Sequence, residues 1–180
     1  MVRKLSMDEL NRMTTDQFKH ASKNPFVIVL DNVRSQNNIG SIFRTADAFL
    51  GEAIYLCGIT SVPPNKEIHK TALGATDSVK WEYSKDTLEL VKKLKDNDYQ
   101  VVAFEQVKGS LPLNQFKPEK GKKYALVFGH EVHGIQQEVI NICDHWIEIP
   151  QFGTKHSLNI AVSAGIAIWE FYRQIHDSEN

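Results

Sequence analysis

The sequence predicts one α/β domain built around a mostly parallel sheet. Its 180 residues are enough for one sizeable core and too few for two comfortable domains. Short apolar runs rich in β-branched residues recur along the chain, and helical patterns lie between them. Because strands that alternate with helices usually pair in parallel, we expect helices to cover both faces of the sheet.

The expected elements follow in order along the chain. A short separate helix is expected at about residues 6–22, ahead of the first strand. Five buried strands are expected, at residues 26–33, 53–59, 99–106, 124–129 and 145–150. The helical patterns between them are strongest at residues 38–51, 86–97 and 134–143.

The last expected helix, at residues 157–175, is apolar almost all round and rich in small residues. We expect it to be buried in the core and against a partner subunit. Ala161, Ala164, Gly165 and Ala167 would allow another helix to approach closely, so a symmetric homodimer is expected.

The composition is that of an ordinary soluble globule, with 42% hydrophobic and 24% charged residues. The start lacks the apolar core of a signal peptide, and no apolar run is long enough to span a bilayer. A cytoplasmic location without membrane contact is therefore expected. Cys57 and Cys143 are far apart and lack metal-ligand spacing, so we expect free buried thiols and no zinc site.

A net charge of −1 conceals an uneven distribution of charge. Residues 108–123 form a basic segment, whereas residues 131–180 are acidic. The charged residues of the basic segment are Lys108, Lys117, Lys120, Lys122 and Lys123, against Glu119. A solvated lysine-rich loop explains this segment by itself, so the charge permits an RNA partner without arguing for one.

The stretch "FGHEVHGI", residues 128–135, places His130, Glu131 and His133 between two glycines. A zinc-protease helix needs its histidines four apart, so that both lie on one helical face. Here they are three apart, and two glycines fit a loop better than a helix interior. No metal site is expected from this stretch.

Three polar stretches follow expected strands, at "DNVRSQNNIGSIFR", "GHEVHGI" and "PQFGTKHSLN". In open α/β sheets, ligands bind outside the carboxyl ends of the strands, where these stretches should meet. Each also has a purely structural interpretation: Asn38 or Ser157 as a helix cap, and Gly129 or Gly134 as a turn residue. Three such stretches at one edge favour a binding site.

The common nucleotide-binding and hydrolase motifs are absent. The first strand is followed by "NNIGSIFR", which has one glycine where a dinucleotide site needs GxGxxG, and no GxxxxGK string occurs. Ser157 beside His156 suggests a hydrolase only weakly, because Gly-x-Ser-x-Gly is missing.

Taken in order, the stretches resemble the three motifs of the SpoU (TrmH) family of S-adenosylmethionine-dependent RNA ribose 2′-O-methyltransferases, in the SPOUT superfamily. "NNIGSIFRTADAFLG" is similar to the first motif, "ALVFGHEVHGI" to the second, and "IEIPQFGTKHSLNIAVSAGIAIWE" to the third. The resemblance implies a parallel α/β sheet with a deep C-terminal trefoil knot, and a homodimer whose active site is completed at the interface. It divides the chain into a helical extension, residues 1–24, and a catalytic domain, residues 25–180.

The resemblance also assigns roles to residues. S-adenosylmethionine would be held by the second and third motifs, largely through backbone groups, and no metal is implied. The implied cofactor-binding residues are Phe128, Gly129, Glu131, Gly134, Ile149, Pro150, Ser157 and Leu158. The implied catalytic residues are Arg44, Asn38, Ser157, Asn159 and Glu131. His130 and His133 occupy variable positions of the second motif, so their closeness to Glu131 is taken as incidental.

Arg44 matches the motif-one arginine, which the family mechanism treats as a general base. A guanidinium with a pKa above about 12 is a reluctant base. We therefore favour a role in stabilising a phosphate or the developing alkoxide, with water accepting the proton.

The resemblance leaves the RNA substrate open. Arg3, Lys4, Arg12 and Lys19 in the leading segment favour tRNA, with ribosomal RNA as the alternative. The alternative from another class of function is a catalytically silent RNA-binding homologue. The presence of all the implied catalytic residues weighs against it.

Overall fold

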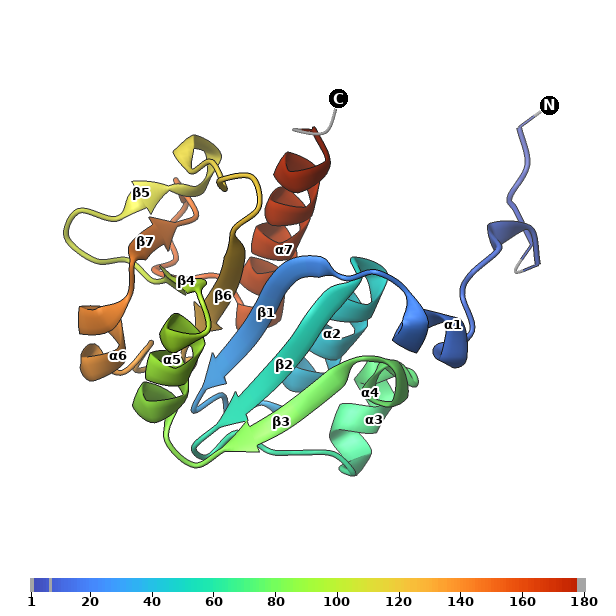
Figure 1. The fold of residues 1–180 in the computed structure, drawn as a ribbon, viewed down its shortest axis with the longest axis horizontal. Helices are drawn as coiled ribbons and strands as arrows, with labels where there is room; N and C mark the ends of the chain where they lie inside the picture. Colours follow the sequence, from blue (N-terminus) through green and yellow to red (C-terminus); the bar gives the residue numbers. More distant parts are fainter. Residues whose placement is uncertain (1, 7, 178–180) are drawn as a thin grey trace.

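One sheet of seven parallel strands forms the centre of the computed structural model, which describes residues 2–6 and 8–177 (Figure 1). The strand order is β3-β2-β1-β6-β4-β7-β5. Their bounds are β1 Asn24–Asp31, β2 Gly51–Cys57, β3 Lys80–Ser84, β4 Tyr99–Phe104, β5 Leu111–Pro112, β6 Lys123–Phe128 and β7 His145–Glu148. The five strands expected from the sequence are all present, which confirms the α/β prediction.

The sequence did not predict the two edge strands, β3 and β5. All five β3 residues are at least partly exposed, so the run lacks the buried apolar pattern that indicates a strand. The β5 strand is only two residues long and pairs with β7 alone. Edge strands carry a weaker apolar signal because one side has no neighbouring strand.

Helices cover both faces of the sheet (Figure 1). Alternate residues of β1 enter two separate core clusters, with Ile28 and Leu30 on one face and Val27 and Val29 on the other. The first face packs against α2 Gln36–Ala48, α3 Lys66–Ala72, α4 Ala75–Ser78 and α7 Ile160–Asp177. The second face packs against α5 Thr87–Asp96 and α6 Gln137–Ile142. This two-sided burial is why the central strands read as continuous apolar runs.

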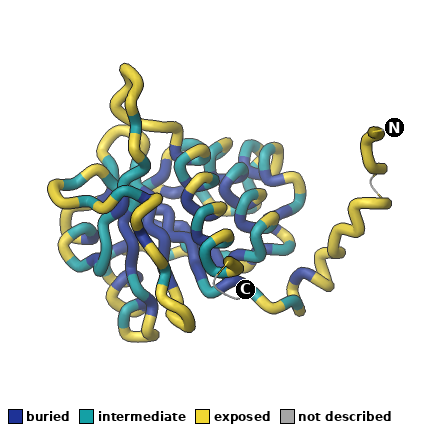
Figure 2. Tube along the Cα trace, turned by 90° about the horizontal axis from the view of Figure 1, so that it is seen from above, coloured by how far each residue is buried: buried dark blue, intermediate teal, exposed yellow. Residues whose placement is uncertain are grey.

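The N-terminal segment is less helical than expected. It contains a 3-10 turn, η1 Asp8–Leu10, and the short helix α1 Thr15–His20, separated by Asn11 at a φ of 46°. Phe18 of α1 is buried in the first core cluster, whereas the segment before it is exposed and stands away from the domain (Figure 2). Residue 7 of the expected helix, and residues 1 and 178–180 at the chain ends, lie outside the described residues.

The last helix differs from its prediction in two respects. It begins at Ile160, and the residue that caps it is Asn159, whose Oδ1 accepts the amide hydrogen of Ala161 at 2.8 Å. Ser157 therefore does not cap it. Ala164 and Ala167 are fully buried in the core of the chain itself, so they are not on the helix surface that faces outward.

Three further expectations concern burial and topology. Cys57 and Cys143 are free and buried, as predicted, and burial raises the pKa of each thiol to about 12. No helix in the described part of the chain is both long and apolar enough to cross a membrane. The deep trefoil knot stays a prediction.

Candidate active site

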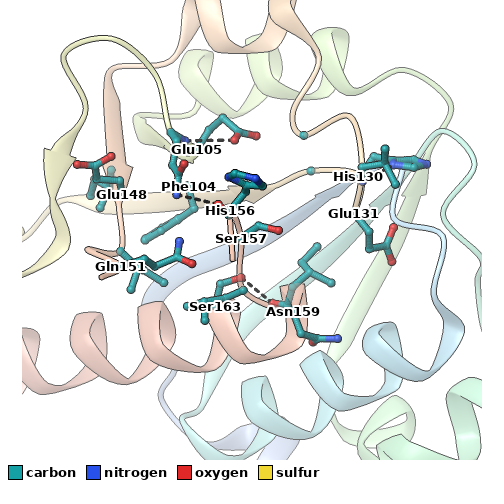
Figure 3. A pocket seen from close by; sticks show the side chains of 18 residues that line it. Phe104, Glu105, His130, Glu131, Glu148, Gln151, His156, Ser157, Asn159 and Ser163 are labelled. Carbon is teal, nitrogen blue, oxygen red and sulfur yellow. Dashed lines mark hydrogen bonds between the residues drawn. The ribbon is translucent and has the colours of Figure 1, made fainter. Parts of the chain in front are cut away.

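A cavity of about 500 Å³ lies at the carboxyl ends of β4, β6 and β7 (Figure 3). Its walls come from the ends of these strands, from the loop at residues 129–134 and from the segment that leads into α7. The volume lies within the range of small-molecule sites, and the position agrees with the rule for open α/β sheets.

Most of the residues implied by the second and third motifs line this cavity. They are Gly129, Glu131, Gly134, Ile149, Ser157, Leu158 and Asn159. Phe128 lies behind the wall: it is buried and stacks on Phe104, a lining residue, with ring centroids 4.9 Å apart. Pro150 is outside the lining, between Ile149 and Gln151.

Glu131 joins the second motif to the first. Its Oε1 accepts the amide hydrogen of Ser35 at 2.8 Å, and its Oε2 accepts that of Arg34 at 3.0 Å. These amides lie at the start of α2, where free N–H groups and the helix dipole favour an anion. Desolvation raises the pKa of the largely exposed Glu131 carboxylate, but hydrogen bonds from backbone amides and from Asn38 together outweigh it, so the pKa is lowered from its usual value.

Asn38 connects Glu131 to the third motif. Its Nδ2 is 3.5 Å from Glu131 Oε1, and its Oδ1 accepts a hydrogen bond from Asn159 Nδ2 at 3.1 Å. Asn38 is not the cap of α2: the cap is Ser35, whose hydroxyl oxygen accepts the amide hydrogen of Asn38. A hydrogen-bonded chain of Glu131, Asn38 and Asn159 thus links three segments far apart in sequence.

The loop at residues 129–134 is closed on itself. His130 and Gly134 exchange backbone hydrogen bonds of 3.0 and 2.8 Å. The ring nitrogen Nδ1 of His130 accepts the amide hydrogens of Val132 and His133, at 3.0 and 3.4 Å. His130 therefore has a structural role in the loop, while Glu131 points toward α2. Within the described ranges, no three His, Cys, Asp or Glu side chains are grouped to hold a metal ion.

Both glycines of this loop sit where a side chain would collide with a neighbour. A Cβ at Gly129 would lie 2.2 Å from the backbone of Gly134 and Ile135. Gly134 has a φ of 68°, and a Cβ there would lie 2.2 Å from Glu105 Oε2. The glycines thus permit the close backbone approach that shapes this part of the cavity.

The contribution of β4 to the cavity was not predicted from the sequence. Phe104, Glu105 and Gln106 line the cavity, and Gln106 Nε2 donates to the carbonyl oxygen of His156 at 3.3 Å. The signal was available, because this strand was predicted and its carboxyl end must reach the same edge as its parallel neighbours.

Arg44 lies outside this cavity in the single chain. It lines a second groove, of about 680 Å³, together with Arg12 and residues of α1, α2 and α4. Neither guanidinium forms an ion pair or hydrogen bond with another described residue. One copy of the chain therefore brings together Glu131, Asn38 and Asn159, but does not bring Arg44 to them.

The fold and the cavity define an α/β protein with a cavity at the carboxyl edge of its parallel sheet. The sequence profile of the SpoU rRNA Methylase family matches residues 25–169. The chain belongs to this family, which confirms the resemblance of its motifs.

Known proteins with similar sequence or structure agree with this assignment. A Staphylococcus aureus protein, provisionally named a TrmH family tRNA/rRNA methyltransferase, is 31% identical over 151 residues, 84% of this chain and 60% of the relative. An AdoMet-bound rRNA methyltransferase from Sinorhizobium meliloti has a TM-score of 0.78 and 30% identity, over 86% of this chain and 58% of that one. This chain thus spans about 60% of the length of these two relatives.

A third similar structure is closer to this chain in length. It concerns the 2-OH methylation of C/U34 on tRNA and has a TM-score of 0.75 and 26% identity. The match covers 84% of this chain and 97% of that one.

Proposed function

We propose that this protein transfers the methyl group of S-adenosylmethionine to a ribose 2′-hydroxyl of RNA, with tRNA as the favoured substrate. The observation that carries the proposal is the cavity at the sheet edge, lined by the family's second and third motifs and hydrogen-bonded to the first. The Sinorhizobium meliloti relative is an AdoMet-bound enzyme, and the tRNA-related structure concerns methylation of a 2-OH group.

The cavity fits this cofactor in size and in chemistry. Its volume of about 500 Å³ suits a nucleoside with a methionine tail, and Phe104, Ile149 and Leu158 supply apolar wall. The residues proposed to hold it are Phe128, Gly129, Glu131, Gly134, Ile149, Pro150, Ser157 and Leu158. When bound, the cofactor supplies a methyl group that is already activated on a sulfonium.

The polar residues of the chain would position the RNA hydroxyl. Glu131, Asn38 and Asn159 form a hydrogen-bonded chain from the cavity to the start of α2, so a group bound by one would be aligned by the others. Ser157, at the cavity wall, is proposed to help place the substrate. Arg44 is proposed to stabilise a phosphate or the developing alkoxide, with water accepting the proton.

Arg44 can meet the cavity only if a second copy of the chain completes the site, and we propose a homodimer for this reason. The outward face of α7 supports it. Val162, Ile166 and Trp169 are 51%, 39% and 49% exposed, and they recur at the spacing that places them on one side of the helix. A Cβ on Gly165 would meet no neighbour, so this face is also open to close approach.

The groove around Arg44 is the proposed contact for the RNA backbone. Arg12 and Arg44 both line it beside Asp47, and neither arginine forms an ion pair with another described side chain. Arginines of this kind bind phosphate groups. Because Arg12 belongs to the projecting N-terminal segment, this segment is proposed to contribute to substrate choice. Ribosomal RNA remains the alternative substrate.

One set of assays tests the proposal. Calorimetry should show binding of S-adenosylhomocysteine and none of NAD, and labelled methyl should pass from S-adenosylmethionine to tRNA. When the RNA is hydrolysed to nucleosides, mass spectrometry should find the methyl group on the ribose 2′-oxygen. Cofactor binding without transfer to tRNA or rRNA would support the silent RNA-binding homologue, and NAD binding alone would refute the methyltransferase.

A further inference from the structure

Two carboxylates hold the end of the loop that follows β6, at residues 135 and 136. Glu105, just past the end of β4, accepts the amide hydrogen of Ile135 on Oε2 at 3.0 Å. Asp31, the last residue of β1, accepts the amide hydrogen of Gln136 on Oδ2 at 2.8 Å. The two carboxylates therefore bind two consecutive backbone amides, and they come from the ends of β1 and β4, the two strands that flank β6.

Asp31 is a fully buried anchor. Its Oδ1 accepts hydrogen bonds from Thr87 Oγ1 at 2.6 Å and from Gln136 Nε2 at 2.7 Å. Thr87 is the first residue of α5, so the loop is tied to the start of that helix as well as to β1. A buried carboxylate is costly unless it is fully hydrogen-bonded, and these contacts offset that cost.

Glu105 is the anchor on the cavity side. Its Oε1 accepts the amide hydrogen of Gln106 at 3.1 Å, so each carboxylate oxygen binds a different backbone amide. Gly134 leaves room for this contact, because any Cβ at that position would overlap Glu105 Oε2. The carboxylate thus packs directly on the loop backbone.

We infer that Glu105 and Asp31 are positioning residues that set the loop at residues 129–136 in its binding conformation before the cofactor arrives. This inference rests on the proposed function of the cavity. A loop ordered in advance binds more tightly because less conformational freedom is lost on binding. The loop lines the proposed cofactor cavity and contributes no residue to the proposed RNA groove, so the effect of these two residues should fall on cofactor affinity rather than on RNA affinity.

The variant Glu105→Gln tests the inference with little change in shape. Glutamine has one side-chain oxygen, so it can accept from only one of the two amides and presents an N–H group to the other. We expect the affinity for S-adenosylhomocysteine to fall about tenfold, as for one lost hydrogen bond. Hydrogen exchange at the Ile135 amide, followed by NMR, should become faster, while affinity for tRNA stays unchanged.

Glu52→Gln is the matched control. Glu52 is a half-buried carboxylate of β2 that accepts one hydrogen bond, from Tyr99 Oη, so Glu52→Gln removes a charge while the glutamine oxygen can still accept that hydrogen bond. It should leave Ile135 exchange and cofactor affinity unchanged. Asp31→Asn should accelerate exchange at Gln136, and if that buried variant fails to fold, Glu105→Gln still decides the question.

The outcomes separate this inference from the proposed function. Unchanged Ile135 exchange in Glu105→Gln, or equal loss of cofactor affinity in Glu52→Gln, overturns the positioning role. Weaker cofactor binding with normal Ile135 exchange would mean that Glu105 contacts the cofactor itself, and also overturns it. If the unmodified protein does not bind S-adenosylhomocysteine, the proposed function fails, whereas Ile135 exchange still reports whether Glu105 holds the loop.

Discussion

The substitution Glu131→Gln should loosen the start of α2 and destabilise the protein. Glu131 uses both carboxylate oxygens to accept the amide hydrogens of Arg34 and Ser35. Glutamine keeps one acceptor oxygen and turns an N–H group toward the other amide. One charge-assisted hydrogen bond is lost, the other becomes neutral, and the favourable interaction with the helix dipole disappears.

The size of the effect follows from these contacts. A hydrogen bond to a charged group contributes about 1.5–3 kcal/mol when well shielded. Glu131 is an exposed side chain, so water can replace part of the lost interaction, and the expected loss is about 1–2 kcal/mol. For a chain of this length, a loss of about 1 kcal/mol in the free energy of unfolding lowers the melting temperature by about 2–4 °C. The variant should therefore melt about 2–8 °C below wild type.

The loss should depend on pH in a defined direction. The pKa of Glu131 is lowered in the folded protein, so its contribution is complete above the ordinary carboxylate pKa of about 4.3. It disappears as the pH falls from there through the lower folded-state pKa. The melting difference between wild type and Glu131→Gln should therefore be full at pH 7 and shrink in acid.

Thermal unfolding followed by circular dichroism, at pH 7 and again at acid pH, measures the effect. Glu138→Gln is the control, because Glu138 is an exposed carboxylate of α6 with no side-chain hydrogen bond to the other described residues. It should melt within about 1 °C of wild type, as surface substitutions usually do. Equal melting of wild type and Glu131→Gln at pH 7 would show that this carboxylate does not hold α2.

Three other substitutions test the site and the assembly. Arg44→Ala should lower the rate of methyl transfer by about a hundredfold or more while folding and cofactor binding are retained, and near-normal transfer in this variant would exclude catalysis by Arg44. Rescue of the rate by Arg44→Lys would favour simple charge stabilisation. Ile166→Arg should yield a folded monomer by light scattering, whereas Ala164→Arg should unfold the chain; a monomeric wild type would contradict the dimer. Gly134→Ala should cost about 1–3 kcal/mol and weaken cofactor binding, with the unobstructed Gly153→Ala as control.

The outline of the fold could be predicted because its signals are local. A strand buried on both faces must be apolar over several consecutive residues, as at "FVIVL" in β1. The carboxyl-edge rule then placed the polar stretches together without any knowledge of strand order. The same rule would have included Glu105, had the end of β4 been considered alongside the others.

Helix orientation was harder to predict. The last helix is apolar almost all round, so its pattern does not show which face enters the core. In the structure, Ala164 and Ala167 pack inward beside Ile168, while Val162 and Ile166 face outward. The choice depends on the sheet and on α2, against which this helix packs, and not on the helix sequence alone.

The amino-acid sequence by itself determined the parallel α/β class, the family and two of the three segments that line the cavity, those of the second and third motifs. Only the tertiary structure decided the hydrogen bonds between Glu131 and Ser35, 96 residues apart, and between Asn159 and Asn38, 121 residues apart. It also placed Arg44 on a separate groove and Glu105 in the cavity wall, against the backbone of the loop. Such pairings depend on β1 lying beside β6 and β6 beside β4, an order that long-range packing sets and that no local run of residues specifies.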